Sequence, residues 1–573
     1  MSADRPPGSH PSAPKLAARA NPAHPAAAGR ARRRLSTVGL PYVEETWSDD
    51  EAAVLRRYVT NIEGPVFALV NLPEVVKGAL FARYSRSPKS LRRLFLDEFV
   101  DDLDTSDDHS VDATVGVARA EALYDRVFLE YGDDSVAQLA GVHLACEQAS
   151  NLLTKVLERG RLMSYMEKST RYVGYDTRLG GRFRYYRPSD VLSSPLGPRY
   201  VGDLDRLFDA YAELAPVLQD WAREHHPKSP DDSDFVYRST IRAMALDAVR
   251  GILPAASLSN LGIYGTGQAY ETLVLRLRAS ALPEARAYAE LVLEELRKVI
   301  PSFLSRVDRP ERGGAWVDYL RRTREALAET AEELLPGGPA KPPPEVALVD
   351  FDPEGEDKVL AALLYPHTDL PDASILDAVR RLSTDDRLAL VRTAMGERGG
   401  RRHKPGRGLE RTDYRFDICS DYGAFRDLQR HRLLTVDWQS LSPLHGYVLP
   451  EAVVEAGAAD RFTEAMDRSA ALHDALAEAV PAAASYAVSL AYRIRYVMQL
   501  NAREALHVLE LRTSPQGHPS YRRVCQTMHR LIAEKAGHHA VAEMMRFVDH
   551  GDPDFESTRL ESERRAEARR TGA

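Results

Sequence analysis

The chain has 573 residues, of which 44% are hydrophobic, so it is long enough for two hydrophobic cores and too long for one ordinary domain. Its 84 acidic and 76 basic side chains give a net charge of −8. Because no overall positive field would concentrate a polyanion, the composition argues against a general nucleic-acid-binding protein.

The cysteines and the hydropathy pattern indicate the cellular compartment in which the protein is expected. Cys146, Cys419 and Cys525 lie far apart and show no CxxC spacing, which indicates a reducing environment and predicts no structural metal. No stretch approaches the roughly 18 uninterrupted apolar residues that a membrane-spanning helix needs. We therefore expect a cytoplasmic protein with no membrane partner.

Composition divides the chain into five segments. Residues 1–37 are rich in Pro, Ala, Ser and Arg and predict a disordered tail, because they would bury too little apolar surface to offset the entropy lost on ordering. The segment LLPGGPAKPPP predicts a linker over 334–344. Two domains are then expected over 38–333 and 345–558, with a charged tail over 559–573.

Helical periodicity dominates both domains. The stretches Ala285–Ile300 and Tyr521–Ile532 repeat apolar residues at the i, i+3, i+4 spacing of a buried helical face. Strand signals are fewer, at Tyr185–Tyr186 and over Tyr414–Ile418. The predicted class is therefore α+β and helix-rich.

An internal repeat links the two domains. LERGRLMS at 157–164 and LQRHRLLT at 428–435 share the frame L-x-R-x-R-L-x-S/T. Each is followed by a helix that ends in arginine, QAYETLVLRLR at Arg278 and NAREALHVLELR at Arg512. The same order of motifs in both halves indicates a tandem duplication.

These motifs resemble the flavin-dependent thymidylate synthases, whose signature is R-H-R-x-x-S followed by N-E-x-S-x-R-Y. The first half reads RGRLMSYMEKSTRY from Arg159, the second half opens with RHRLLT from Arg430, and YGDDSV resembles the family's G-H-x-S/T-x-x-E-H segment without its histidines. The resemblance covers about residues 40–305 and 375–555. It implies two tandem copies of the family domain packed as a pseudo-dimer.

The resemblance also assigns ligands. Arginine suits them because its planar guanidinium donates paired hydrogen bonds to phosphate and stays ionised. The expected dUMP-binding residues are Arg159, Arg161, Glu167, Ser169, Thr170, Arg171 and Arg250. The expected FAD-binding residues are Arg430, His431, Arg432, Asn501, Arg503, His507 and Ser135.

Motif losses in the two halves are complementary. The second half lacks the E-x-S-x-R pattern and has Ser485 where the first has Arg250, while the first half has Gly160 for His431 and about Gly267 for Asn501. We expect each half to supply what the other lacks. A homodimer of this double-length chain would then reproduce the family's tetramer.

The implied reaction is reductive methylation of dUMP at C5, with methylenetetrahydrofolate, FAD and NADPH. Arg278 and Arg512 would place a fixed positive charge where negative charge develops on the uracil. Two alternatives remain open: a degenerate paralogue that binds nucleotide or flavin without catalysis, and a related flavoenzyme that alkylates another pyrimidine nucleotide.

Each motif also has an interpretation without a ligand. The arginines of RHR could form a solvated basic turn, and the loop at 167–171 could be a surface turn with an internal ion pair. Asn501 could cap a helix. Cys525, on an apolar helical face, is expected to be a core residue.

Overall fold

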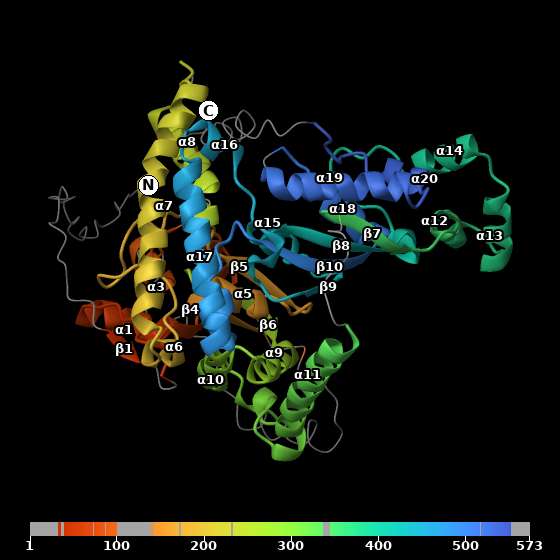
Figure 1. Ribbon diagram of the computed structural model, residues 1–573. Coiled ribbons are helices and arrows are strands. Elements are labelled where there is room, and N and C mark those ends of the chain that lie inside the picture. The colour runs from red at the N-terminus through yellow and green to blue at the C-terminus, as the bar shows by residue number, and fades with distance from the viewer. Residues whose placement is uncertain are drawn as a thin grey trace, which may run out of the picture.

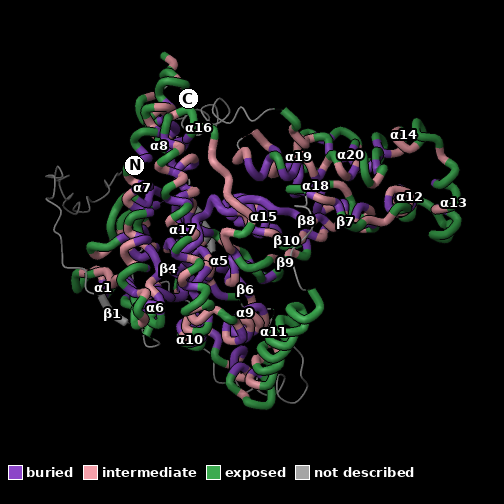
Figure 2. The backbone as a smooth tube through the Cα atoms, in the orientation of Figure 1, coloured by how far each residue is buried: buried purple, intermediate pink, exposed green. Residues whose placement is uncertain are grey.

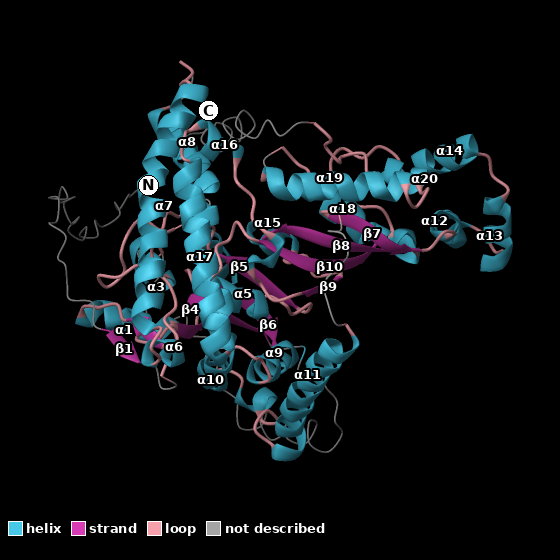
Figure 3. Ribbon diagram, viewed as in Figure 1, coloured by secondary structure: helices cyan, strands magenta, loops and turns pink. Residues whose placement is uncertain are grey.

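The computed structural model describes residues 33–35, 39–72, 74–85, 87–99, 138, 141–170, 173–230, 233–335, 344–515 and 517–551. Helices dominate these residues, and the strands form small antiparallel sheets (Figure 3). This confirms the α+β, helix-rich class. None of the described helices combines the length and apolarity needed to cross a membrane.

The first half of the chain is built on a four-stranded sheet in the order β3-β4-β6-β5, against which α5, α9 and α10 pack. Its strands are β1 Arg33–Leu35, β2 Pro41–Val43, β3 Val66–Leu69, β4 Gly141–Ser150, β5 Met163–Glu167 and β6 Leu258–Thr266. Its helices are α1 Asp49–Tyr58, α2 Glu74–Tyr84, α3 Leu91–Glu98, α5 Asn151–Leu157, α6 Ser189–Ser193, α7 Gly197–His225, α8 Asp234–Val249, α9 Gly267–Arg278, α10 Pro283–Arg297 and α11 Ala315–Leu334.

The second half repeats this plan with a sheet in the order β7-β8-β10-β9, along which α19 lies (Figure 1). Its strands are β7 Val346–Phe351, β8 Asp413–Asp421, β9 Thr435–Trp438 and β10 Arg493–Asn501. Its helices are α12 Gly355–Leu364, α13 Asp372–Arg380, α14 Thr384–Met395, α15 Tyr422–Leu428, α16 Glu451–Glu455, α17 Ala459–Ala479, α18 Ala502–Arg512, α19 Pro519–Glu534 and α20 His539–Met544.

The elements that follow corresponding strands begin in the same way in both halves. Ser150 and Asp421 accept the capping hydrogen bonds at the starts of α5 and α15, and Thr266 and Asn501 do so at the starts of α9 and α18. Side-chain oxygens at these positions satisfy backbone N–H groups that have no partner within the helix. The repeat seen in the sequence is therefore a repeat of sheet order and of helix starts.

The two halves join through segments 251–256 and 486–491, which run antiparallel to each other. The joining bonds are Ala255 N–H to Val488 O, Leu490 N–H to Leu253 O, Ala256 N–H to Tyr486 O and Ala491 N–H to Gly251 O, all 2.8–3.0 Å. The bonds occur in reciprocal pairs, as a twofold axis between two similar units requires. The long helices α7 and α17, one from each half, pack side by side next to this junction (Figure 1). The expected pseudo-dimer is thus present within one chain.

Most of the expected elements lie where the periodicity put them. Ala285–Ile300 falls largely in α10, Tyr521–Ile532 lies inside α19, and Tyr414–Ile418 lies inside β8. Tyr185 forms only an isolated bridge to Ser257, so no strand forms there.

The segment boundaries agree with the structure less closely at the N-terminus. Arg33–Leu35, expected in a disordered tail over 1–37, pairs with Pro41–Val43. The helix α11 ends at Leu334, the first residue of the expected linker. Residues 336–343 of that linker and the expected tail over 559–573 lie outside the described residues.

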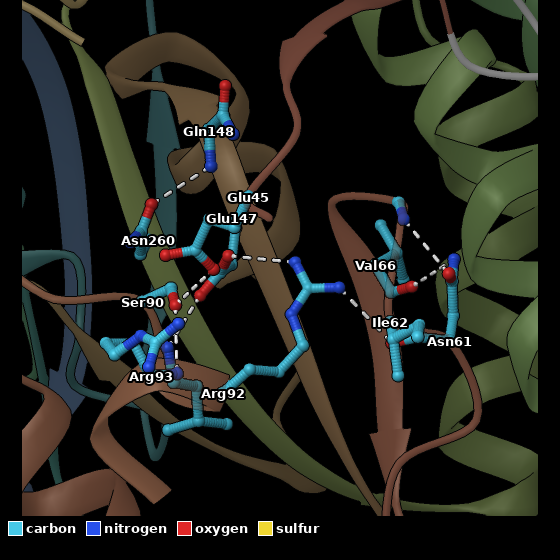
Figure 4. A network of polar contacts seen from close by, with 12 residues as sticks. Glu45, Asn61, Ile62, Val66, Ser90, Arg92, Arg93, Glu147, Gln148 and Asn260 are labelled. Carbon is cyan, nitrogen blue, oxygen red and sulfur yellow. Dashed lines mark hydrogen bonds and ion pairs between the residues drawn. The ribbon is translucent and has the colours of Figure 1, made fainter. Parts of the chain in front are cut away.

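A buried polar network fixes the strand that leads to α5 (Figure 4). Glu147 accepts hydrogen bonds of 2.9 Å from the Tyr84 hydroxyl and the Leu91 N–H, and Arg92 Nη2 lies 3.6 Å from its carboxylate. The next residue, Gln148, has a φ of 55° at an irregularity in β4, and its N–H donates to Asn260 Oδ1. The network therefore holds the bend after which Ser150 starts α5.

Candidate functional site

The RHR turn of the second half lies against strand β5 of the first half. Arg430 Nη2 donates a 2.5 Å hydrogen bond to Glu167 Oε2, and Arg426 Nη2, on α15, donates a 2.9 Å bond to Glu167 Oε1. Lys155 Nζ of α5 lies 3.2 Å from the same carboxylate and also contacts Glu158. The expected flavin motif and the expected nucleotide motif are therefore in direct contact across the pseudo-dimer.

Glu167 is ionised in this cluster. Its side chain has no exposed surface, and burial alone would raise its pKa, but Arg426, Lys155 and Arg430 hold the pKa well below the usual range. Burial raises the pKa of the neighbouring Glu158. Sequence reasoning missed Lys155 and Arg426 because both lie on helices outside the signature motifs. The sequence hints at them only in that a basic residue stands at the same spacing before each R-x-R motif.

The second pair of arginines makes matching contacts in the two halves. Arg432 donates to the Met163 carbonyl and lies 3.5 Å from Ser164 Oγ. Arg161 Nη2 donates a 2.9 Å bond to Thr435 Oγ1. Each R-x-R turn therefore contacts the start of β5 or β9 in the other half. The contact lies at the Ser or Thr that ends the shared frame L-x-R-x-R-L-x-S/T.

His431 lies at the centre of the expected flavin-binding residues. Arg512 Nε donates a 3.0 Å hydrogen bond to His431 Nε2, and Arg512 Nη2 donates 2.6 Å to the Asp427 carbonyl. The His507 ring lies 5.5 Å from the His431 ring, centroid to centroid. Burial lowers the pKa of His431 to about 3 and that of His507 to about 4, so both rings are neutral at pH 7.

The same cluster also has the residue types of a metal site, since His431, Glu504 and His507 present ligand atoms within 4.8 Å of one another. The surroundings oppose a cation. His431 Nε2 accepts from Arg512, which leaves the ring proton on Nδ1, 3.6 Å from Glu504. Further positive charge comes from Lys404, Arg401, Arg432 and Arg503. This arrangement favours an anion.

Asn501 and Arg503 begin α18 beside this cluster. Asn501 Oδ1 accepts from the Glu504 N–H at 2.9 Å, so the helix cap expected as its alternative role is present. Arg503 Nε donates to the Pro405 carbonyl at 3.2 Å, and its Nη1 lies 3.4 Å from Glu410. Both residues are held by their own half of the chain.

Arg250, from the first half, is buried at the start of α15. An added Cβ on Gly423 would lie only 3.4 Å from Arg250 Nη2, so the guanidinium packs against the first turn of that helix. Arg250 Nη2 and Arg430 Nε are buried and have no hydrogen-bond partner in the described structure. Buried donors without partners are rare in folded proteins and suit an anionic ligand.

The expected nucleotide loop follows β5. Ser169 N–H donates to the Ser85 carbonyl at 3.1 Å, and Thr170 is buried. Between Glu167 and Ser169, Lys168 is buried within 3.4 Å of two backbone carbonyls, and burial lowers its pKa to about 8. The motif gave no signal for Lys168, which occupies a variable position. Arg171 and Ser135, expected to bind dUMP and FAD, lie outside the described residues.

The residues around Arg159 occupy the place in the pseudo-dimer that corresponds to the cluster around His431. We call this place the mirror position, and its side chains differ from those of the His431 cluster. Arg159 pairs with the exposed Asp437 at 2.7 Å and lies over the Trp438 ring, 5.1 Å from its centroid. Tyr165 donates a 3.0 Å hydrogen bond to the Gly160 carbonyl, and an added Cβ on Gly160 would lie 2.7 Å from the Tyr165 hydroxyl. Tyr165 therefore fills the space that a side chain matching His431 would need.

Arg278 does not lie at the site that contains Arg512. It donates to Glu290 at 2.7 Å and to Asp308 at 2.8 Å, both in its own half. Counted from the matching caps Thr266 and Asn501, Arg278 lies one residue further along its helix than Arg512 does. One residue turns a side chain by about 100° around a helix, which explains the different direction.

The same comparison of caps corrects the expected match between Asn501 and Gly267, since the matching residue is Thr266. Arg276, which was not among the expected ligands, is the arginine of α9 that lies near Tyr165 and Arg159. Its pKa is lowered by burial and it carries a buried Nε without a partner among the described residues.

Comparisons with known proteins agree with this arrangement. A family model described as "thymidylate synthase complementing protein" matches residues 79–302 and 347–538, one region in each half. A UPF0159 protein of Chlamydia muridarum is 39% identical over 529 residues, which are 91% of this chain and 99% of the relative. A UPF0159 protein of Thermoplasma acidophilum is 32% identical over 504 residues, or 83% and 96% of the two chains.

Proposed function

The chain belongs to the flavin-dependent thymidylate synthase family, and we propose that it catalyses the reductive methylation of dUMP to dTMP with FAD, methylenetetrahydrofolate and NADPH. The observation that carries the proposal is the direct contact between Arg430 and Glu167. It brings the R-H-R motif of one half against the E-x-S-x-R motif of the other. Neither half alone contains both motifs.

The chemistry around His431 supports a flavin-binding role. Its neutral histidines lie among the positive charges of Lys404, Arg432 and Arg503, which together suit a pyrophosphate. We assign FAD to His431, Arg432 and Arg503, with Arg430, Asn501 and His507. Bound flavin supplies the redox carrier between NADPH and the methylene group.

The dUMP phosphate is assigned to the nucleotide side. Arg250 offers a buried donor without a partner in the described structure, and Ser169, Thr170 and Arg171, which follow Glu167 in the sequence, are assigned to the same ligand. Arg512 would hold a positive charge beside the uracil and stabilise its N3-deprotonated form. Glu167 is assigned the role of positioning Arg430, because all of its oxygens are engaged by Arg426, Lys155 and Arg430.

One complete site per chain follows from this assignment. In the mirror position, Tyr165 occupies the space of a matching histidine, and Thr266 replaces Asn501. The reaction is placed in the cytoplasm, which suits three buried cysteines that form no disulfide.

The test is a turnover assay with purified chain, dUMP, methylenetetrahydrofolate, NADPH and FAD, with dTMP measured by mass spectrometry. We expect a yellow protein and dTMP formation. Arg430→Ala should lose bound flavin and retain dUMP binding, whereas Arg171→Ala should lose dUMP and retain flavin. Loss of the same ligand by both variants would contradict the division of labour.

Two outcomes would favour the alternatives. Tight dUMP and FAD binding without dTMP, and without rescue of a thymidine-requiring strain, would indicate a non-catalytic paralogue. A methylated product from dCMP or from a ribonucleotide, but not from dUMP, would indicate a related C5-alkylating flavoenzyme.

A further inference from the structure

The helix α11 projects from the body of the molecule, and no described element covers it. Every residue from Arg321 to Leu335 is exposed, and none of the helix is buried (Figure 2). Val317, near its start, packs against the core, and Arg324, halfway along it, donates to the Ala279 carbonyl. The residues after Arg324 extend away from α9 (Figure 1).

Large apolar side chains follow one face of this helix. Trp316, Tyr319, Leu327 and Leu334 are exposed to 40%, 60%, 63% and 72%. At about 100° per residue they fall within a sector of about 80°; Thr323 lies in the same sector, and the half-buried Leu320 lies about 20° beyond its edge. Val317 and Arg324 project from another side, so this stripe faces away from the contact with the body.

An uncovered helix of this kind needs a partner. In folded proteins most helical stability comes from packing an amphipathic face, and the apolar face of this 20-residue helix is exposed. The stripe in α11 repeats at alternating three- and four-residue steps through Trp316, Leu320, Thr323, Leu327, Thr330 and Leu334. That spacing is typical of a two-helix seam.

The charges of α11 indicate which partner fits. Its first part carries Arg321, Arg322 and Arg324 with one acidic residue, Asp318, which pairs with Arg321, and the charged residues of its second part are all acidic, Glu325, Glu329, Glu332 and Glu333. Two copies laid antiparallel would place the basic end of each against the acidic end of the other. A parallel pair would align like charges. We propose that α11 is a dimerisation helix, which pairs antiparallel with α11 of a second copy of this chain.

One edge of the stripe makes the pairing specific. Arg322, Glu329 and Glu333 project along one edge of the stripe. In an antiparallel pair, this edge of one copy lies beside the same edge of the other copy. Arg322 and Glu329 are about 10 Å apart along one helix and so cannot pair within it. Arg322 of one copy can, however, pair with Glu329 of the other copy. The twofold axis then produces this contact twice, as an isologous interface requires.

The first test measures mass in solution by sedimentation of the full chain at micromolar concentration. We expect a dimer whose dissociation constant rises at least about a hundredfold in Leu327→Glu, because the substitution puts a charge in the apolar seam. Glu332→Arg, on the opposite side of the helix, is the matched control and should leave the dimer intact. A monomeric wild-type chain would overturn the proposal, and so would equal dissociation by both variants.

The second test is a charge exchange. Arg322→Glu and Glu329→Arg should each weaken the dimer about tenfold through like-charge contacts, and the double variant should restore it. Rescue requires the two residues to face each other between copies. A dimer unaffected by all three variants would place the interface elsewhere, and additive loss in the double variant would exclude antiparallel pairing.

Discussion

Arg430 donates a 2.5 Å hydrogen bond to Glu167 across the two halves of the chain. The glutamate is fully buried, and the arginine belongs to the motif expected to hold flavin. The position of the R-H-R turn in one half is therefore set by a carboxylate in the other. This relationship joins the two halves through a buried ion pair.

Glu167→Gln should destabilise the protein by about 3–5 kcal/mol. The substitution removes the negative charge that balances the buried positive charges of Lys155, Arg426 and Arg430. Chemical denaturation monitored by circular dichroism would measure the loss. The matched control is Asp437→Asn at the exposed pair with Arg159, which should cost less than about 1 kcal/mol. Equal effects would show that burial of the Glu167 cluster does not matter.

A second prediction concerns pH. Burial raises the pKa of Glu284 from 4.5 to about 7, although Ser150 and Tyr486 donate hydrogen bonds to it. The folded state therefore binds a proton that the unfolded state releases, and stability should fall as pH rises from about 4.5 to about 7. Each pKa unit corresponds to about 1.4 kcal/mol.

Glu284→Gln should remove that component of the pH dependence. Unfolding free energies of the variant and the wild type at pH 5 and pH 7.5 would check it, and an unchanged slope in the variant would contradict the assignment to Glu284.

A third prediction separates capping from ligand binding. Asn501→Ala and Thr266→Ala each remove a helix cap and should cost about 1 kcal/mol. Only Asn501→Ala should also weaken flavin binding, measured by fluorescence titration with FAD. If Asn501→Asp, which retains a capping oxygen, bound flavin as tightly as the wild type, Asn501 would be a cap alone.

A fourth prediction concerns stoichiometry. Because Tyr165 fills the position that mirrors His431, the purified chain should contain one FAD per polypeptide. Absorbance of released flavin against protein concentration would measure the ratio. A ratio of two would show that the Arg159 side also binds flavin.

The sequence could predict much of the fold because its signals are local. The apolar periodicity of Ala285–Ile300 and of Tyr521–Ile532 identified α10 and α19, and the alternation in YRFDI identified β8. The pair of R-x-R motifs revealed the duplication. These patterns depend only on the neighbours of each residue along the chain.

Other features could not be read in this way. Lys155 and Arg426 join the Glu167 cluster from helices outside any motif, and Arg278 is turned away from Arg512's direction by a one-residue difference in its helix. The role of Tyr165 depends on the space left by Gly160. Such contacts depend on distances between residues far apart in the chain.

The sequence by itself determined the family, the duplication and the complementary loss of motifs, because residue identity and spacing carry that information directly. Only the tertiary structure decided that the two motifs meet at Glu167 and Arg430, that the mirror position is filled, and that α11 is left uncovered. The physical reason is that burial and charge pairing arise when strands and helices from both halves pack together across the twofold junction.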